Sequence, residues 1–94
     1  MLFAVICTDK PGHQDVRIAN RTDHVAYLGA NKEIVKAAGP FLNDDGGMIG
    51  SLLIVETADR AALETFLTND PYAKAGLFEN VDIRNWKWTV NAPA

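Results

Sequence analysis

The chain has 94 residues, of which 48% are hydrophobic and 22% are charged, and its formal net charge at pH 7 is −3. This length predicts a single globular domain over residues 1–94, because so short a chain has room for one hydrophobic core. The acidic balance, with nine lysines and arginines scattered along the chain, argues against binding to nucleic acid, which usually needs a basic patch.

The N-terminal apolar run, residues 2–7, is too short to span a membrane or to form the core of a signal peptide. We therefore expect a soluble, cytoplasmic protein with no membrane partner. Cys7 is the only cysteine and cannot form a disulfide within the chain. We interpret it as a small buried side chain rather than a nucleophile.

The first half of the chain predicts a strand, a helix and a second strand. Residues 2–8 are continuously apolar and β-prone, which is typical of a central strand covered on both faces. After turn residues at 9–12, a helix is expected from about Asp15 to Asn31. Residues 34–42 predict a second strand, which is irregular or lies at an edge because it contains Gly39-Pro40.

The strongest strand signal is MIGSLLIVE, residues 48–56, which follows a hairpin turn at 43–47. Alternate residues of this strand are expected on opposite sides of the sheet, one set being Ser51, Leu53 and Val55 and the other Gly50, Leu52 and Ile54. Both sets are mainly apolar. The chain's own helices can cover one face, so we expect the sheet of a second subunit to cover the other.

Two further helices are expected in the second half. Thr57 or Asp59 can cap a helix that runs to about Thr68 and turns an apolar stripe inward. Asp70 is then placed to cap a short helix over residues 71–75, which has proline at its first position and glycine after its end.

A last strand is predicted from Val81 to about Val90, with Trp86 and Trp88 on one face and a bulge near Arg84-Asn85. The resulting order, β-α-β-β-α-β, is that of the ferredoxin-like fold, an α+β fold with an antiparallel four-stranded sheet. Helices lie on one face of this sheet only, which again leaves the other face for a partner, and a homodimer is expected.

The first helix carries a stripe of functional groups. Arg17, Arg21, His24 and Leu28 are spaced four, three and four residues apart and therefore lie along one face. A stripe that joins two guanidinium groups and an imidazole to an apolar edge has two interpretations. It is either an anion-binding, proton-transferring site or the flank of a helix packed on the sheet with its charges turned outward.

His24 and Asp70 are the pair best suited to chemistry, because an imidazole transfers protons near neutral pH and a carboxylate can set its tautomer. Asp70 also has a purely structural interpretation as a helix cap. Tyr72 could add a hydrogen bond or act as an aromatic packing anchor. No metal-binding or nucleotide-binding motif accompanies these residues, so the sequence predicts neither a metal nor a cofactor.

The order and spacing of short motifs across the whole chain resemble the YciI-like family, whose members carry the YCII-related domain. These motifs are Arg17 and Arg21 spaced with His24, Gly39-Pro40, Gly50-Ser51, Asp70-Pro71-Tyr72, Ala75-Gly76 and an aromatic residue at Trp86. The resemblance implies a ferredoxin-like chain that dimerises into an α+β barrel similar to that of muconolactone isomerase. It also implies an active site that pairs His24 with Asp70. One branch of the family includes a dehydrochlorinase that acts on a chlorinated hydroxyquinol.

We therefore expect a small acid–base enzyme of the lyase or isomerase type that acts on a cyclic or aromatic anionic small molecule. His24 would move the proton and Asp70 would orient the His24 ring, while Arg17 or Arg21 would hold a carboxylate or phenolate of the ligand. The remaining pocket residues are expected to be Gly50 and Ser51 on the floor and Tyr72 and Trp86 on the apolar walls.

Two other functions fit the same residues. A non-catalytic ligand-binding or accessory barrel module would keep the imidazole and the carboxylate as a structural pair. A monooxygenase that degrades haem or oxidises quinols on the same dimeric barrel is the third function, but no arrangement of haem ligands is recognisable.

Overall fold

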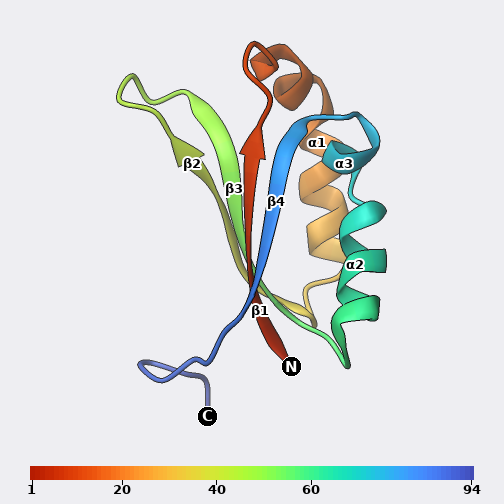
Figure 1. The fold of residues 1–94 in the computed structure, drawn as a ribbon, viewed down its shortest axis with the longest axis vertical. Helices are drawn as coiled ribbons and strands as arrows, with labels where there is room; N and C mark the ends of the chain where they lie inside the picture. Colours follow the sequence, from red (N-terminus) through yellow and green to blue (C-terminus); the bar gives the residue numbers. More distant parts are fainter.

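Four strands form one antiparallel sheet in the order β2-β3-β1-β4, and the three helices lie against one of its faces (Figure 1). The computed structural model describes every residue from 1 to 94. Its elements are β1 (Leu2–Asp9), α1 (Gln14–Ala30), β2 (Val35–Leu42), β3 (Met48–Glu56), α2 (Arg60–Thr68), α3 (Pro71–Lys74) and β4 (Phe78–Asn85). This is the predicted ferredoxin-like α+β arrangement. None of the helices combines the length and the apolar character that a bilayer crossing needs.

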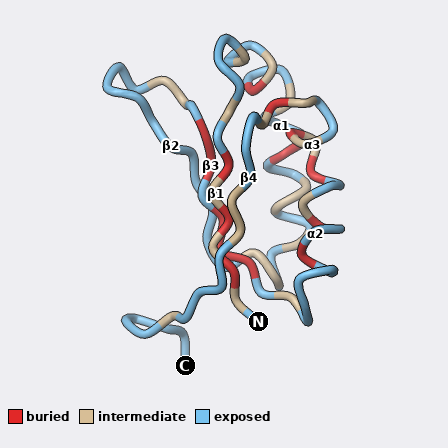
Figure 2. The backbone as a smooth tube through the Cα atoms, in the orientation of Figure 1, coloured by how far each residue is buried: buried red, intermediate tan, exposed pale blue.

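The hydrophobic core lies between the sheet and the helices, where buried segments of the central strands face buried segments of α2 (Figure 2). β1 and β3 pair so that Val5 is opposite Leu53, and both side chains are closed to solvent. The core cluster consists of Phe3, Val5, Cys7, Leu53, Val55, Leu63 and Phe66. Leu53 and Val55 belong to this cluster, whereas Leu52 and Ile54 of the other predicted set do not, which agrees with the alternation predicted for residues 48–56.

The second face of the sheet carries no helix (Figure 1). Phe41 of β2 and Leu52 of β3 remain 39% and 37% exposed. Gly50 lies on this face, where an added Cβ would come within 2.5 Å of the Cys7 carbonyl oxygen and 3.3 Å of the Phe41 ring. Adjacent residues of a strand point to opposite faces, so Gly50 and Ser51 do not share one pocket floor.

Side chains of the residues just before α2 and α3 cap both helices. Asp59 caps α2, because its carboxylate accepts a hydrogen bond from the amide of Ala62 at 2.8 Å. The other cap candidate, Thr57, instead donates its hydroxyl hydrogen to the Asp59 carbonyl. Asp70 caps α3 through the amide of Tyr72. A carboxylate in this position satisfies an amide that the first turn of a helix leaves without a partner.

The last strand differs from the prediction. β4 spans Phe78–Asn85 rather than residues 81–90, so Trp86 and Trp88 lie beyond it. The reason is the length of its partner. β4 pairs antiparallel with β1, and the amide of Trp86 donates the last hydrogen bond to the carbonyl of Leu2, where β1 begins. Aromatic residues with high β-propensity cannot extend a strand that has no partner left.

The predicted bulge near Arg84-Asn85 is also wrong, because the shift in register between β1 and β4 lies at the other end of the pair, between Thr8 and Asp9. β2 is an edge strand, as predicted. Its irregularities lie near its two ends, whereas Pro40 pairs within the ladder. An edge position tolerates proline because one side of the strand needs no amide donor.

Candidate active site

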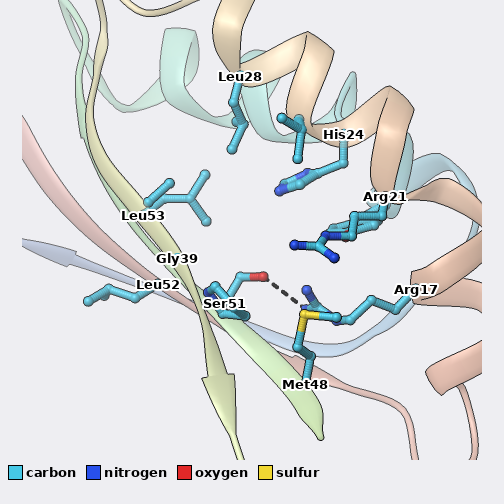
Figure 3. Close-up of a pocket in the computed structure, with 13 residues that line it drawn as sticks. Arg17, Arg21, His24, Leu28, Gly39, Met48, Ser51, Leu52 and Leu53 are labelled. Carbon is cyan, nitrogen blue, oxygen red and sulfur yellow. Dashed lines mark hydrogen bonds between the residues drawn. The ribbon is translucent and has the colours of Figure 1, made fainter. Parts of the chain in front are cut away.

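A cavity of about 140 Å³ opens between α1, the strands β2 and β3, and Tyr72 of α3 (Figure 3). A cavity of roughly 150 Å³ accepts a benzene molecule, so this one has room for one small ring. Its apolar side includes Leu28, Met48 and Leu53, and Arg21 and His24 project into it from α1. The predicted stripe on the first helix therefore faces a cavity.

His24 lines this cavity and contacts Asp70, a residue 46 positions further along the chain that does not itself line the cavity. The Nδ1 atom of His24 lies 2.8 Å from Oδ1 and 3.0 Å from Oδ2 of Asp70, and both residues are more than nine-tenths buried. A lone pair on Nδ1 would repel the carboxylate, so neutral His24 carries its proton on Nδ1 and donates it to Asp70.

The other ring nitrogen of His24 is free to act on a ligand. Nε2 forms no hydrogen bond within the chain, and no buried side-chain nitrogen or oxygen lacks a partner. Nε2 is therefore open to the cavity that His24 lines. When the proton is on Nδ1, Nε2 carries a lone pair and can accept a proton, which is the state that a general base requires.

Asp70 makes a structural contact and a contact with His24 at the same time. Its Oδ1 atom accepts the amide hydrogen of Tyr72 at 2.9 Å, in addition to the hydrogen bond from His24. The cap and the site interpretation are thus compatible, because one carboxylate oxygen has lone pairs for both donors. The short helix α3 holds the carboxylate where α1 presents the imidazole.

Tyr72 forms one wall of the cavity and packs directly on the imidazole. The rings of Tyr72 and His24 are stacked, with centroids 3.8 Å apart and an angle of 12° between their planes. Phe78 meets Tyr72 edge-on, at 6.1 Å and 88°. Burial raises the pKa of Tyr72 above its ordinary value, although the charges of Arg17 and Arg21 oppose the shift. The phenol therefore stays protonated at neutral pH.

Arg17 is almost completely buried and is committed to protein partners. Its Nε and Nη2 atoms donate to the two carboxylate oxygens of Asp9 at 2.7 and 2.9 Å, and Nη2 also donates to Ser51 Oγ at 2.9 Å. Burial alone would lower the pKa of Arg17. The Asp9 carboxylate outweighs that effect, so the pKa is raised and the guanidinium stays charged.

Arg21 is the cation of the site that remains available. It is exposed, lines the cavity between Arg17 and His24, and forms no hydrogen bond or ion pair with another side chain (Figure 3). A free guanidinium beside an imidazole can bind the oxygen atoms of a planar anion through two parallel hydrogen bonds. The structure thus distinguishes two arginines that sequence spacing treats as equivalent.

Two expected pocket residues lie elsewhere. Gly50 faces the side of the sheet that bears Phe41 and does not line the cavity. Trp86 follows the end of β4, is 39% exposed, and packs against Trp88 with ring centroids 5.7 Å apart. It does not line the cavity of its own chain. Ser51 does line the cavity, but it also binds Arg17.

Sequence reasoning missed Asp9, which it treated as a turn residue, and the cavity residues Met48 and Leu53. The available signal for Asp9 was an acid at the end of a buried strand, eight residues before an arginine. The available signal for Leu53 was its place on the same face of β3 as Ser51. No group of three or more His, Cys, Asp or Glu side chains is placed to hold a metal ion.

Cys7 is closed to solvent on the helix-facing side of β1, and burial, followed by the charges of Asp70 and Asp9, raises its pKa from 9.0 to about 12. We expect a thiol reagent at pH about 8 to label the folded protein about 10³-fold more slowly than the unfolded chain, because the thiolate is scarce. The contribution of Cys7 to stability should be complete below about pH 9 and lost as the pH rises towards about 12. Equal labelling rates in the folded and unfolded protein would contradict this placement.

Comparisons with known proteins agree with this architecture. The sequence model of the YCII-related domain family matches residues 1–87. Protein YciI from Escherichia coli O6:H1 is 30% identical over 95 aligned residues, which cover 93% of this chain and 97% of YciI. Protein YciI from Shigella flexneri matches to the same extent.

Among solved structures, the chain resembles 5-chloro-2-hydroxyhydroquinone dehydrochlorinase from Burkholderia phenoliruptrix in complex with 2,5-dihydroxybenzoquinone. The identity is 40%, the TM-score is 0.86, and 93% of this chain and 94% of the other are covered. A NIPSNAP family protein from Agrobacterium tumefaciens, at 19% identity, a TM-score of 0.59 and coverage of 98% and 95%, shares the fold alone. The same holds for an antibiotic biosynthesis monooxygenase at 17% identity, a TM-score of 0.54 and coverage of 93% and 99%. The family match over nearly the whole chain shows that this protein belongs to the YCII-related domain family.

Proposed function

We propose that this protein is a small acid–base enzyme of the lyase or isomerase type that acts on a hydroxylated aromatic or quinone-like anion. One observation carries the proposal: His24 is hydrogen bonded to Asp70 through Nδ1 while its Nε2 opens into a cavity beside the free guanidinium of Arg21. An oriented base and an adjacent anion-binding group are the two parts that removal of a proton from such a ring requires.

In this mechanism Nε2 of His24 accepts a proton from a ring hydroxyl or an acidic ring carbon. Asp70 stabilises the imidazolium that forms, because its carboxylate already accepts the Nδ1 hydrogen. Arg21 pairs with the oxygen on which negative charge develops. Tyr72 and the apolar side of the cavity hold the face of the ring and exclude water.

The size of the cavity and the relatives point to the same ligand class. About 140 Å³ suits a single six-membered ring with small substituents. The related dehydrochlorinase is named for 5-chloro-2-hydroxyhydroquinone and its structure is a complex with 2,5-dihydroxybenzoquinone, and both molecules are single oxygenated rings. We carry that ligand class over to this chain, together with the acid–base reaction type.

Isothermal titration calorimetry that measures the binding of 2,5-dihydroxybenzoquinone to the wild-type protein tests the ligand class. Replacing Arg21 with glutamine should weaken binding about tenfold or more, because a charged hydrogen bond to the anion is lost. Arg60→Gln is the matched control, since Arg60 is an exposed arginine on α2 paired only with Glu64, and its affinity should equal the wild type. Equal binding by Arg21→Gln would remove Arg21 from the site.

We further propose that the protein works as a homodimer in the cytoplasm. The support for the dimer is the apolar sheet face that bears Phe41 and Leu52, because no helix of the chain covers it. A ligand-binding module without turnover is the second candidate function, and it would use the same cavity. Binding of the probe without conversion of any hydroxylated aromatic substrate favours the module.

A further inference from the structure

We propose that Arg17 is a positioning residue, which sets the orientation of the His24 ring through the ring of Tyr72. The catalytic role of His24 rests on the proposed function. The arrangement of the three side chains, however, belongs to the ligand-free protein, and it is tested there without any assay of activity.

The three groups form a continuous stack. The guanidinium carbon of Arg17 lies 4.7 Å from the centroid of the Tyr72 ring, which is within the range of a cation–π contact. The same ring stacks on the imidazole of His24 with centroids 3.8 Å apart. Two residues of α1 that are two helical turns apart therefore contact one aromatic ring, which α3 contributes.

Arg17 is a rigid support rather than a mobile ligand-binding group. Its three hydrogen bonds to Asp9 and Ser51 attach it to the end of β1 and to β3. The bond to Asp9 uses both carboxylate oxygens, the geometry that fixes the plane of a guanidinium. Moving Arg17 towards a ligand would leave Asp9 as a buried charge without a partner, which costs several kcal/mol.

His24 needs this second support because Asp70 holds only one of its atoms. The hydrogen bond restrains the distance from Nδ1 to the carboxylate, but coupled changes in the two side-chain torsions of His24 can keep this distance and still tilt the ring. Stacking on Tyr72 removes this freedom, and Arg17 with edge-on Phe78 holds Tyr72 in turn. The stack therefore sets the direction in which Nε2 points into the cavity. This direction matters because a displacement of 1 Å at a reacting group can lower the rate about a hundredfold.

Proton NMR of the ligand-free protein measures the stack directly. The chain has two histidines, His13 and His24, and the carbon-bound ring protons of His24 lie over the Tyr72 ring, whose ring current moves their signals upfield. Two changes to the Arg17 support are informative. Arg17→Lys keeps the charge but loses the planar fork, and the double variant Asp9→Asn with Arg17→Met removes both charges so that neither is left buried alone.

We expect the double variant to lose most of the upfield displacement of the His24 signals, and Arg17→Lys to lie between it and the wild type. The signals of His13, which is partly exposed, should not move. Arg84→Lys is the matched control, because Arg84 pairs with Asp82 at 2.9 Å on the surface, and its His24 signals should equal the wild type. Unchanged His24 signals in the folded double variant would overturn the proposal. If the double variant does not fold, unchanged signals in Arg17→Lys would overturn it.

Turnover gives a second readout. Arg17→Lys should lower kcat about tenfold with KM within about twofold of the wild type, because the base is misaligned while Arg21 still binds the ligand. A higher KM with an unchanged kcat would overturn the proposal and place Arg17 among the ligand-binding groups. If the wild type turns over no hydroxylated aromatic compound, the proposed function fails, and the NMR result still decides whether Arg17 orients His24.

Discussion

Replacing His24 with glutamine is expected to lower turnover of a hydroxylated aromatic substrate by about 10²- to 10⁴-fold, the usual contribution of a general base. The amide of glutamine can still donate a hydrogen bond to Asp70, so the buried carboxylate keeps a partner. The protein should therefore stay folded, with a loss of no more than about 2 kcal/mol in the free energy of unfolding. Steady-state kinetics and denaturant titration of the same preparation measure the two effects.

His13→Gln is the control for this experiment. His13 is partly exposed, precedes α1, and contacts only the carbonyl of Pro11 through its ring, so its replacement should change neither turnover nor stability. Wild-type turnover by His24→Gln would end the acid–base mechanism. A loss of several kcal/mol in stability with unaltered binding of the probe would make His24 a structural residue and favour the non-catalytic module.

Asp70→Asn is expected to lower turnover by about 10³- to 10⁴-fold while costing less than about 1 kcal/mol in stability. The asparagine oxygen can still accept the amide hydrogen of Tyr72 and cap α3. Its NH₂ group then faces Nδ1 of His24 as a donor, which favours the tautomer with the proton on Nε2. That tautomer cannot accept a proton from the ligand, and the same substitution in a catalytic triad costs about 10⁴-fold.

The control is Asp59→Asn, because Asp59 caps α2 through the amide of Ala62 at 2.8 Å but, unlike Asp70, forms no hydrogen bond with His24. Asp59→Asn and Asp70→Asn should have similar small effects on the midpoint of thermal unfolding. Only Asp70→Asn should lower turnover. If both variants keep wild-type turnover, Asp70 acts as a helix cap alone and the proposed role of the His24–Asp70 pair is wrong.

Local patterns along the chain predicted most of the fold. The alternation in residues 48–56 identified both faces of β3, because the period of two residues is a property of the strand itself. The caps at Asp59 and Asp70 follow from short polar side chains before helical segments. The predicted bounds of β4 were wrong because its end depends on a distant segment. β4 ends where its partner β1 begins, at Leu2, and no local pattern in residues 78–90 indicates this.

In the candidate site, too, local spacing predicts some features and contacts between distant segments decide the others. The spacing of Arg17, Arg21 and His24 was enough to place them on one face, because the helical repeat alone decides which residues share a face of α1. The difference between a committed Arg17 and a free Arg21 depends on Asp9, at the end of a strand on the other side of a turn. Packing of distant segments decides which charges find partners, since hydrogen bonds and desolvation act over a few ångströms of space rather than along the sequence.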